Sequence, residues 1–321
     1  MQHLNQAGAL IHIYTDGSIH LNHGGTEMGQ GLFTKIAQLV ATEFQVSIDS
    51  IFCSATRTDK VPNTSPTAAS SGTDLNGMAA KDAAMKIKRR MVNFACDHFS
   101  VTSDRIQFNA GEVIAGDNRL RFAEFVQLAY MNRISLSATG YYKTPKIHYD
   151  RDKAKGQPFF YYANGAAVSE VLIDTLTGEN KLLRTDICQD VGQSINPAID
   201  IGQVEGAFIQ GMGWLTTEEL VWDDQGRLLT TGPASYKIPA IGDTPTEFNV
   251  ELLPDSPNLE ATIFHSKAVG EPPLMLGISV WSALNDAVAS LRNHSLSPVL
   301  DAPATPERIL KACNELRARV A

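Results

Sequence analysis

The stretch "ALIHIYTDGSIHLNHGGTEMGQGLFTKIAQL", residues 9–39, combines a strand pattern, a glycine-rich segment and a helix pattern. Apolar and polar residues alternate on both sides of Asp16-Gly17, a dipeptide typical of the tight turn in a β-hairpin. The glycine-rich segment leads into apolar residues at helical spacing, which predict a helix that begins near Gly31. Two strands followed by a helix indicate a mixed α+β unit.

The rest of the chain continues this mixed pattern. A polar segment at residues 142–158 carries two prolines and alternating charges, so we predict two lobes, residues 1–150 and 151–321. The fold class expected is α+β, with helices packed on mixed and antiparallel sheets. The other predicted elements are a helix at 75–99, a hairpin at 106–122, strands hinged at Thr177-Gly178, an apolar helix opened by Gln203, and helices at 278–291 and 306–320.

Composition excludes several classes of partner. The 321 residues carry a formal net charge of −8 and no lysine- or arginine-rich run, which argues against nucleic acid and anionic membranes. No apolar run approaches the roughly 18 residues of a membrane span, and no signal segment opens the chain, so we expect a cytoplasmic protein. The scattered cysteines are expected to be reduced thiols, which places any iron–sulfur cluster elsewhere: Cys53, Cys96, Cys188 and Cys313.

The glycine-rich loop before the first helix resembles a nucleotide-binding loop only in its spacing. Gly24 and Gly29 have the required separation, but Gln30 and Gly31 follow where that loop needs lysine and a hydroxyl residue. A glycine-rich helix start can still receive an anion or an oxo group on backbone N–H groups, and Gln30 adds a neutral amide donor. The alternative is a turn that merely joins strand to helix.

Two further segments have compositions suited to a ligand. Residues 63–74, "NTSPTAASSGTD", offer many hydroxyl and backbone donors ahead of a helix, which suits a phosphate or a heteroatom-rich cofactor. The alternative is an ordinary loop with Thr73 or Asp74 as the helix N-cap. Residues 200–213, "DIGQVEGAFIQGMG", have glycines on one helix face, so either a ligand or, more commonly, another backbone approaches that face.

The fourth segment, "AVGEPPLMLG" at residues 268–277, presents a single carboxylate. Two prolines after Glu271 fix the backbone, and apolar neighbours predict a shell that favours the neutral acid and suits a general base. The alternative is a surface glutamate in a proline turn.

Together the four segments resemble one family. The phrases "HGGTEMGQG", "VPNTSPTAASSGTDLNG", "DVGQSINPAIDIGQVEGAFIQGMG" and "SKAVGEPPL" are similar, in order, to the molybdenum hydroxylases of the xanthine dehydrogenase and aldehyde oxidase family. The resemblance implies the second molybdopterin-binding region, in which the organic cofactor holds molybdenum and no protein side chain ligates the metal. Glu271 matches the catalytic glutamate, which takes a proton from the attacking hydroxyl. The residues that match cofactor contacts are Gly29, Gln30, Ala68, Ala69, Ser70, Thr73, Gln203 and Gly270.

The resemblance also implies a reaction and partners. "NTSPTAAS" and "GEPPL" are of the xanthine type, which favours hydroxylation of hypoxanthine or xanthine at a ring carbon with water as the oxygen source. Electrons would leave through [2Fe-2S] and FAD centres on other chains or regions. The chain would be the C-terminal part of a molybdenum subunit that needs an N-terminal part for activity. The alternatives are a related aldehyde or N-heterocycle hydroxylase, or an inactive truncated remnant with a structural role.

Overall fold

The computed structural model describes residues 2–60 and 64–319 and divides the chain into two compact units. The first unit comprises Met1–Tyr162 and Pro257–Ala268, and the second comprises Ala163–Ser256 and Val269–Ala321. No sequence signal indicated that Pro257–Ala268 returns to the first unit. The interpretation of 1–150 and 151–321 as lobes of one cofactor-binding region stays a prediction. Both units combine helices with sheets, so the predicted α+β class is confirmed.

The main sheet of the first unit is built around the predicted hairpin. Strands β1 and β2 pair antiparallel, and Gly17 adopts a φ of 86° in the turn between them, where Asp16 Oδ1 accepts the N–H of Ser18 at 2.9 Å. Strand β3 lies parallel to β2, and β7 lies antiparallel to β1. In spatial order the strands are β3 (Ile51–Cys53), β2 (Ile19–His23), β1 (Gln6–Ile13) and β7 (Ser137–Lys143).

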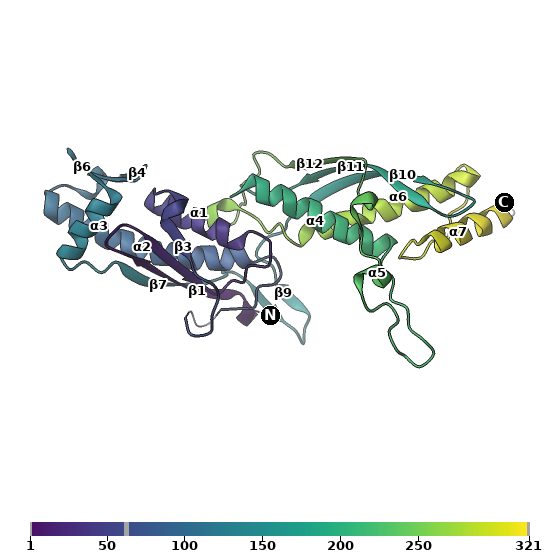
Figure 1. Cartoon of the computed structure of the whole chain (residues 1–321), viewed down its shortest axis with the longest axis horizontal. Helices are drawn as coiled ribbons and strands as arrows, with labels where there is room; N and C mark the ends of the chain where they lie inside the picture. Colours follow the sequence, from purple (N-terminus) through teal and green to yellow (C-terminus); the bar gives the residue numbers. More distant parts are fainter. Residues whose placement is uncertain (1, 61–63, 320–321) are drawn as a thin grey trace. The chain divides into compact units, whose positions relative to one another are not determined.

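Helices α1 (Leu32–Phe44) and α2 (Gly72–Phe99) pack against each other, and α2 also packs on β1 and β7 (Figure 1). The first helix begins next to Gly31, as predicted, whereas α2 begins three residues before the predicted Leu75. A Cβ added at Gly140 of β7 would lie 1.9 Å from the carbonyl oxygen of Ala79. The alanine-rich face of α2 therefore meets the sheet backbone at close range. Its fully buried small residues are Ala79, Ala80, Ala83 and Ala84.

Smaller elements complete the first unit. Residues 106–122 form three antiparallel strands where the sequence predicted one hairpin, because Asn118–Arg121 adds a third strand after the second turn. These elements are β4 (Ile106–Asn109), β5 (Glu112–Ala115), β6 (Asn118–Arg121), α3 (Phe122–Met131), β8 (His148–Asp150) and β9 (Lys155–Gln157).

The second unit contains one three-stranded sheet covered by helices. Strands β10 and β11 form the predicted hairpin, and Gly178 turns it with a φ of 80°. Strand β12 lies parallel to β11, while α4 and α6 pack on the sheet and on each other. The elements are β10 (Gly165–Ile173), β11 (Asn180–Gln189), α4 (Pro197–Thr216), α5 (Pro233–Tyr236), β12 (Glu247–Leu252), α6 (Ile278–Ala289) and α7 (Pro306–Ala318). Residue 320, at the end of the last predicted helix, lies outside the described residues.

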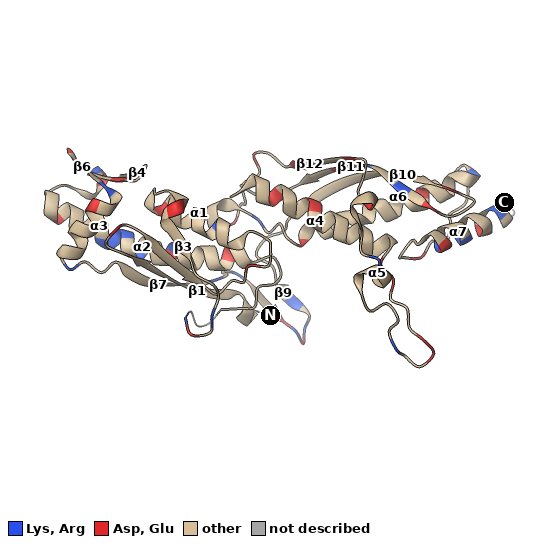
Figure 2. Cartoon of the chain, in the orientation of Figure 1, with Lys and Arg blue, Asp and Glu red and all other residues tan. Residues whose placement is uncertain are grey.

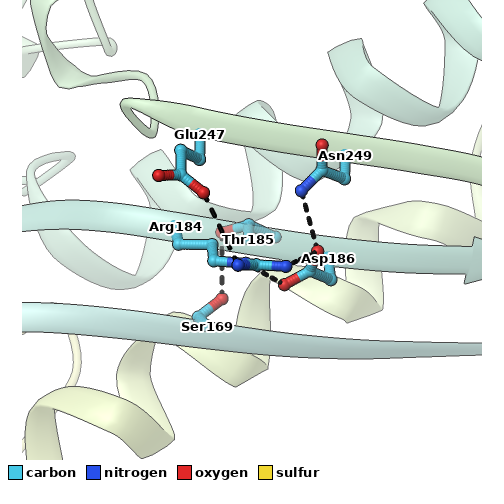
Figure 3. A network of polar contacts seen from close by, with 6 residues as sticks. All are labelled: Ser169, Arg184, Thr185, Asp186, Glu247 and Asn249. Atoms are coloured by element: carbon cyan, nitrogen blue, oxygen red, sulfur yellow. Dashed lines mark hydrogen bonds and ion pairs between the residues drawn. The ribbon is translucent and has the colours of Figure 1, made fainter.

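Charged residues of both signs are spread over the elements of each unit (Figure 2). On β11 and β12, Arg184 contacts Asp186 at 2.6 Å and Glu247 at 3.5 Å, and Asn249 donates to Asp186 at 2.8 Å (Figure 3). The hydrogen bond from Arg184 holds the pKa of Asp186 below its usual value. Because these side chains are solvent-exposed or half-buried, water screens the ion pairs and they contribute little to stability.

One stretch of the second unit, Pro272–Arg292, has a mean hydropathy of 1.4 and is long and apolar enough to cross a membrane. This differs from the sequence prediction, which found no such stretch. The residues span the short helix η6 (Pro272–Gly277), α6 and a final helical turn. Val280, Leu284 and Val288 are buried in the second core, and 28% of the apolar window is buried within the described structure.

Candidate functional site

The glycine-rich loop before α1 is closed by its own acidic side chain. Glu27 Oε1 accepts the N–H groups of Gly29 at 2.9 Å and Gly31 at 3.0 Å, and Oε2 accepts that of Phe33 at 2.9 Å. Partial burial disfavours the ionised carboxylate, but these backbone donors outweigh it and lower the pKa of Glu27. The expectation of free N–H groups at this helix start is therefore wrong. The reason is that a carboxylate of the chain already occupies the place predicted for a ligand.

Gln30 also bonds within this loop. Its Oε1 accepts the N–H of Met28 at 2.5 Å, and its Nε2 donates to the carbonyl oxygen of Thr26 at 2.8 Å. An amide nitrogen carries two hydrogens, so a second donor of Gln30 remains for another acceptor. Gly29, with a φ of 98°, is exposed beside it. The role of both residues at a cofactor oxygen stays a prediction.

The glycine-rich loop is joined to the serine- and threonine-rich loop. The N–H of Thr26 donates to Thr67 Oγ1 at 2.8 Å. A Cβ at Gly24 would lie 2.1 Å from the Thr64 hydroxyl, and one at Gly25 would lie 2.6 Å from Leu32. Gly24 therefore allows the two loops to approach each other closely, and Gly25 allows the glycine-rich loop to pack against α1 and α2.

The second loop ends in an unusual backbone conformation. Ala69 and Ser70 adopt φ values of 55° and 51°, a left-handed region that costs energy for residues with a Cβ. Ser71 follows as the N-cap of α2 but makes no side-chain capping bond to the helix, and its hydroxyl donates instead to Ala68 at 3.1 Å. Thr73 lies in the first helical turn, so it is not the N-cap that the alternative interpretation offered. Residues 61–63 of this segment lie outside the described residues.

Two buried oxygen atoms lie beside these loops without a hydrogen-bond partner among the described residues. They are Thr64 Oγ1 and Asn76 Oδ1, while Asn76 Nδ2 donates to Gly72 at 2.9 Å. A buried polar atom without a partner is costly and points to a missing ligand or water. The strained loop, the uncapped helix start and the two unpaired oxygens therefore fit a heteroatom-rich cofactor. The predicted contacts Ala68, Ala69, Ser70 and Thr73 all lie here.

A polar contact that sequence analysis missed lies at the same helix start. Tyr161 Oη donates to Asp74 Oδ2 at 2.5 Å and accepts the N–H of Ala268 at 2.9 Å. Burial raises the pKa of Asp74 to about 6, although the bond from Tyr161 and the charge of Lys35 act in the opposite direction. Burial also raises the pKa of Tyr161. These residues are far apart in sequence, so no local pattern could reveal the contact.

The buried His23 contacts the part-buried Cys53, and both side chains are electrically neutral. His23 Nδ1 accepts the N–H of Gly25 at 3.1 Å, which leaves Nε2 facing Cys53 Sγ at 3.4 Å. Burial lowers the pKa of His23 to about 4, and burial followed by the charge of Glu27 raises the pKa of Cys53 to about 12. Cys53 is therefore a protonated thiol rather than a nucleophile, in line with the predicted reduced core thiols.

In the second unit, Gln203 does not open its helix as predicted. Helix α4 begins at Pro197, with Asn196 Oδ1 accepting the N–H of Ile199 at 3.2 Å. Proline is favoured at the first helical position because its missing N–H is not needed there, so "NP" was the start signal. Gln203 is partly exposed on the second turn.

The glycines of α4 serve mainly in packing. A Cβ at Gly211 would lie 2.0 Å from the carbonyl oxygen of Leu274, and one at Gly277 would lie 2.5 Å from the Gly211 backbone. Gly213 packs against Pro239 in the same way, whereas Gly206 has no neighbour within 4 Å in the described structure. The helix-packing alternative is thus the correct one at Gly211, and this contact fixes η6 to α4.

Glu271 lies immediately before η6, whose first two residues are the predicted prolines. Its carbonyl oxygen accepts the N–H of Leu274 at 3.0 Å, so the turn is closed and rigid. The expected apolar shell does not form within this chain, since Glu271 is exposed and Val269 points into the core. Gly270 is half-buried beside it. The structure therefore presents this carboxylate outward on a fixed turn.

Among the described residues, no group of three or more His, Cys, Asp or Glu side chains could hold a metal ion. The predicted residues divide between the units: Gly29, Gln30, Ala68, Ala69, Ser70 and Thr73 in the first, and Gln203, Gly270 and Glu271 in the second.

Comparison with known proteins gives a consistent result. Residues 1–245 match the family model of the molybdopterin cofactor-binding domain. The chain is 52% identical to xanthine dehydrogenase/oxidase of Gallus gallus over 314 residues and 50% identical to xanthine dehydrogenase of Dictyostelium discoideum over 317 residues. Both alignments cover 97% of this chain but only 22% of the relative's length.

Solved structures agree. The chain is similar to the Cu,Mo-CO dehydrogenase, with a TM-score of 0.83 and 26% identity over 98% of this chain and 38% of that one. Quinoline 2-oxidoreductase from Pseudomonas putida 86 gives a TM-score of 0.83 and 27% identity, covering 97% of this chain and 38% of its own. The aldehyde oxidoreductase from Desulfovibrio desulfuricans, at 20% identity and a TM-score of 0.73, shares the fold.

Proposed function

Because this chain belongs to the molybdopterin cofactor-binding domain family of the molybdenum hydroxylases, which are oxidoreductases, we propose that it is the C-terminal part of the molybdenum subunit of a xanthine dehydrogenase. The reaction is hydroxylation of hypoxanthine or xanthine at a ring carbon, with water as the oxygen source. The observation that carries this proposal is about 50% identity to xanthine dehydrogenases along 97% of the chain.

The loop before α2 supports the cofactor part of the proposal. When bound, molybdopterin holds molybdenum through its sulfur atoms and supplies the redox chemistry. Backbone and hydroxyl groups of residues 68–73 would bind it at the uncapped helix start, where Thr64 Oγ1 and Asn76 Oδ1 still need partners. Gln30 would use its second amide hydrogen to orient an oxygen atom. Gln203, Gly29 and Gly270 would complete the contacts.

Glu271 is the proposed general base. Its carboxylate would remove a proton from the water-derived oxygen that attacks the electron-poor ring carbon. The two prolines and the Gly211 contact hold the turn in place, so little ordering is needed before proton transfer. The apolar shell that a base needs would come from the bound cofactor, the substrate and other parts of the enzyme.

The chain spans about 22% of the length of its curated relatives, so the remaining functions belong to other regions. We propose that these are the N-terminal part of the molybdenum subunit and the [2Fe-2S] and FAD centres that accept the electrons. A cytoplasmic location and a role in purine catabolism are part of the same proposal.

A related N-heterocycle hydroxylase is the second candidate, since the fold is similar to that of a quinoline oxidoreductase, with a TM-score of 0.83. An aldehyde as substrate, or an inactive remnant, completes the alternatives. The test is to purify the chain alone and together with a polypeptide that supplies the rest of the relatives' length. Molybdenum content and dye reduction are then measured with xanthine, quinoline and an aldehyde.

The expected result is molybdenum binding and xanthine-dependent dye reduction by the complete enzyme only. Turnover of quinoline or aldehyde in preference to xanthine would favour the alternatives. Turnover by the isolated chain would contradict its dependence on the missing regions.

A further inference from the structure

We propose that Tyr161 and Asp74 are positioning residues that link the cofactor loop to the segment leading to Glu271. The inference rests on the proposed function of Glu271 and adds two residues to it. Tyr161 Oη bonds Asp74 in the first turn of α2 and the backbone N–H of Ala268, and Glu271 follows three residues later.

The direction of each bond is fixed by chemistry. A backbone N–H can only donate, so Tyr161 Oη accepts from Ala268 and must direct its own hydrogen to Asp74 Oδ2. Both bonds depend on the same hydroxyl, so loss of that oxygen breaks the connection at both ends. Lys35 and Tyr142 are the other titratable groups that interact with Asp74.

The segment that ends at Ala268 is itself firmly held. Asn258 donates from its backbone to His265 at 2.8 Å and from its side chain to Ser266 at 3.1 Å. Ile263 is fully buried, and a Cβ added at Gly77 of α2 would lie 3.4 Å from it. Ala268 is therefore the last residue fixed to the first unit before the chain enters the second.

Fold stability alone is a poor explanation for this arrangement. A partly buried carboxylate is costly, and an apolar pair would fill the same space without that cost. The Asp74–Tyr161–Ala268 contact instead orients the backbone. Asp74 holds the Tyr161 hydroxyl, and that hydroxyl holds the N–H of Ala268. Only Val269 and Gly270 separate this amide from Glu271 along the chain.

The test uses the complete, molybdenum-loaded enzyme with Tyr161→Phe. The expected result is a fall in kcat of about 10-fold or more, with KM and molybdenum content within about twofold of the original, as for a misplaced catalytic group. Hydrogen exchange at the Ala268 amide should rise at least about 10-fold while exchange at Asn258 is unchanged. Tyr162→Phe is the matched control, because that side chain is 68% exposed.

Asp74 provides the second variant. Asp74→Ala should lower kcat in the same way, and Asp74→Asn, which keeps an acceptor for Tyr161, should restore most of the lost rate. An unchanged kcat in Tyr161→Phe, or equal loosening at Asn258 and Ala268, overturns the proposal. If the complete enzyme shows no xanthine turnover, the proposed function fails, whereas unchanged Ala268 exchange would still refute the linkage separately.

Discussion

The starts of α1 and α2 lie in the same unit but differ in whether a side chain caps them. Glycines surround the start of α1, yet Glu27 occupies its N–H groups. The start of α2 has ordinary residues in left-handed conformations, no side-chain cap from Ser71, and the unpaired Asn76 Oδ1 nearby. Glycine content therefore does not show whether the N–H groups of a helix start are open to a ligand. What matters is whether the chain already satisfies the N–H groups.

The largest effect is expected at Glu271, the carboxylate assigned to chemistry rather than to capping. Glu271→Gln in the complete enzyme should lower kcat at least ~10²-fold, because the amide cannot accept the proton. Steady-state xanthine oxidation at equal molybdenum content measures this. Glu251→Gln, an exposed glutamate of the same unit, is the control. A near-normal rate would remove Glu271 from the mechanism.

The second prediction concerns pH and the first turn of α2. The pKa of Asp74 rises from 3.8 in the unfolded chain to about 6 in the fold, so this group favours folding below pH 4 and loses that contribution as pH rises through 6. The resulting loss in the free energy of unfolding is at most about 3 kcal/mol, and solvent screening makes it smaller. Asp74→Asn should therefore gain stability relative to the original chain between pH 4 and 7. Urea unfolding across this range measures the gain, and a pH-independent difference would contradict it.

A third prediction places a carboxylate at the start of α2, as Glu27 does at the start of α1. Ser71→Asp places a carboxylate where the cofactor is proposed to bind, so molybdenum content should fall about 10-fold, equivalent to about 1.4 kcal/mol. The helix itself should be stabilised slightly by the new N-terminal charge. Metal analysis and thermal unfolding separate the two effects. Full molybdenum loading would show that the start of α2 is not the binding site.

The smallest effect is expected at Glu27. Glu27→Ala should destabilise the fold by about 1 kcal/mol, as loss of a helix cap does. Because the pKa of Glu27 is lowered from 4.5, its contribution is present above pH 4.5 and disappears as pH falls through the folded pKa, the reverse of Asp74. Chemical unfolding at pH 3 and 7 tests this sign. A larger loss at pH 3 would contradict the capping role.

The sequence predicted what local patterns determine. Alternation around Asp16-Gly17 identified the hairpin, and Gly31 marked the start of α1. Gln203 was misplaced because the proline signal for α4 was interpreted as a loop. The Glu27 cap was not predicted, because Glu27 lies before the helix and accepts three backbone N–H groups with one side chain. The Tyr161 contact joins residues far apart along the chain, which no periodicity reports.

The candidate site residues were identified mainly from the family resemblance and only in part from local physical patterns. The composition of 63–74 suggested a ligand loop, but the left-handed conformations of Ala69 and Ser70 and the unpaired oxygen of Asn76 depend on the folded structure. The exposure of Glu271 agrees with the alternative interpretation, a surface glutamate in a proline turn, because Val269 packs into the second core and Met275 is exposed.

The return of Pro257–Ala268 to the first unit has a consequence for synthesis. The chain leaves this unit after Tyr162, and Ile263, a fully buried side chain of its core, emerges about a hundred residues later. At about 5–20 residues per second, the nascent first unit waits several seconds with an unfilled place beside Gly77. Its core is therefore completed only after all three strands of the second sheet have been made.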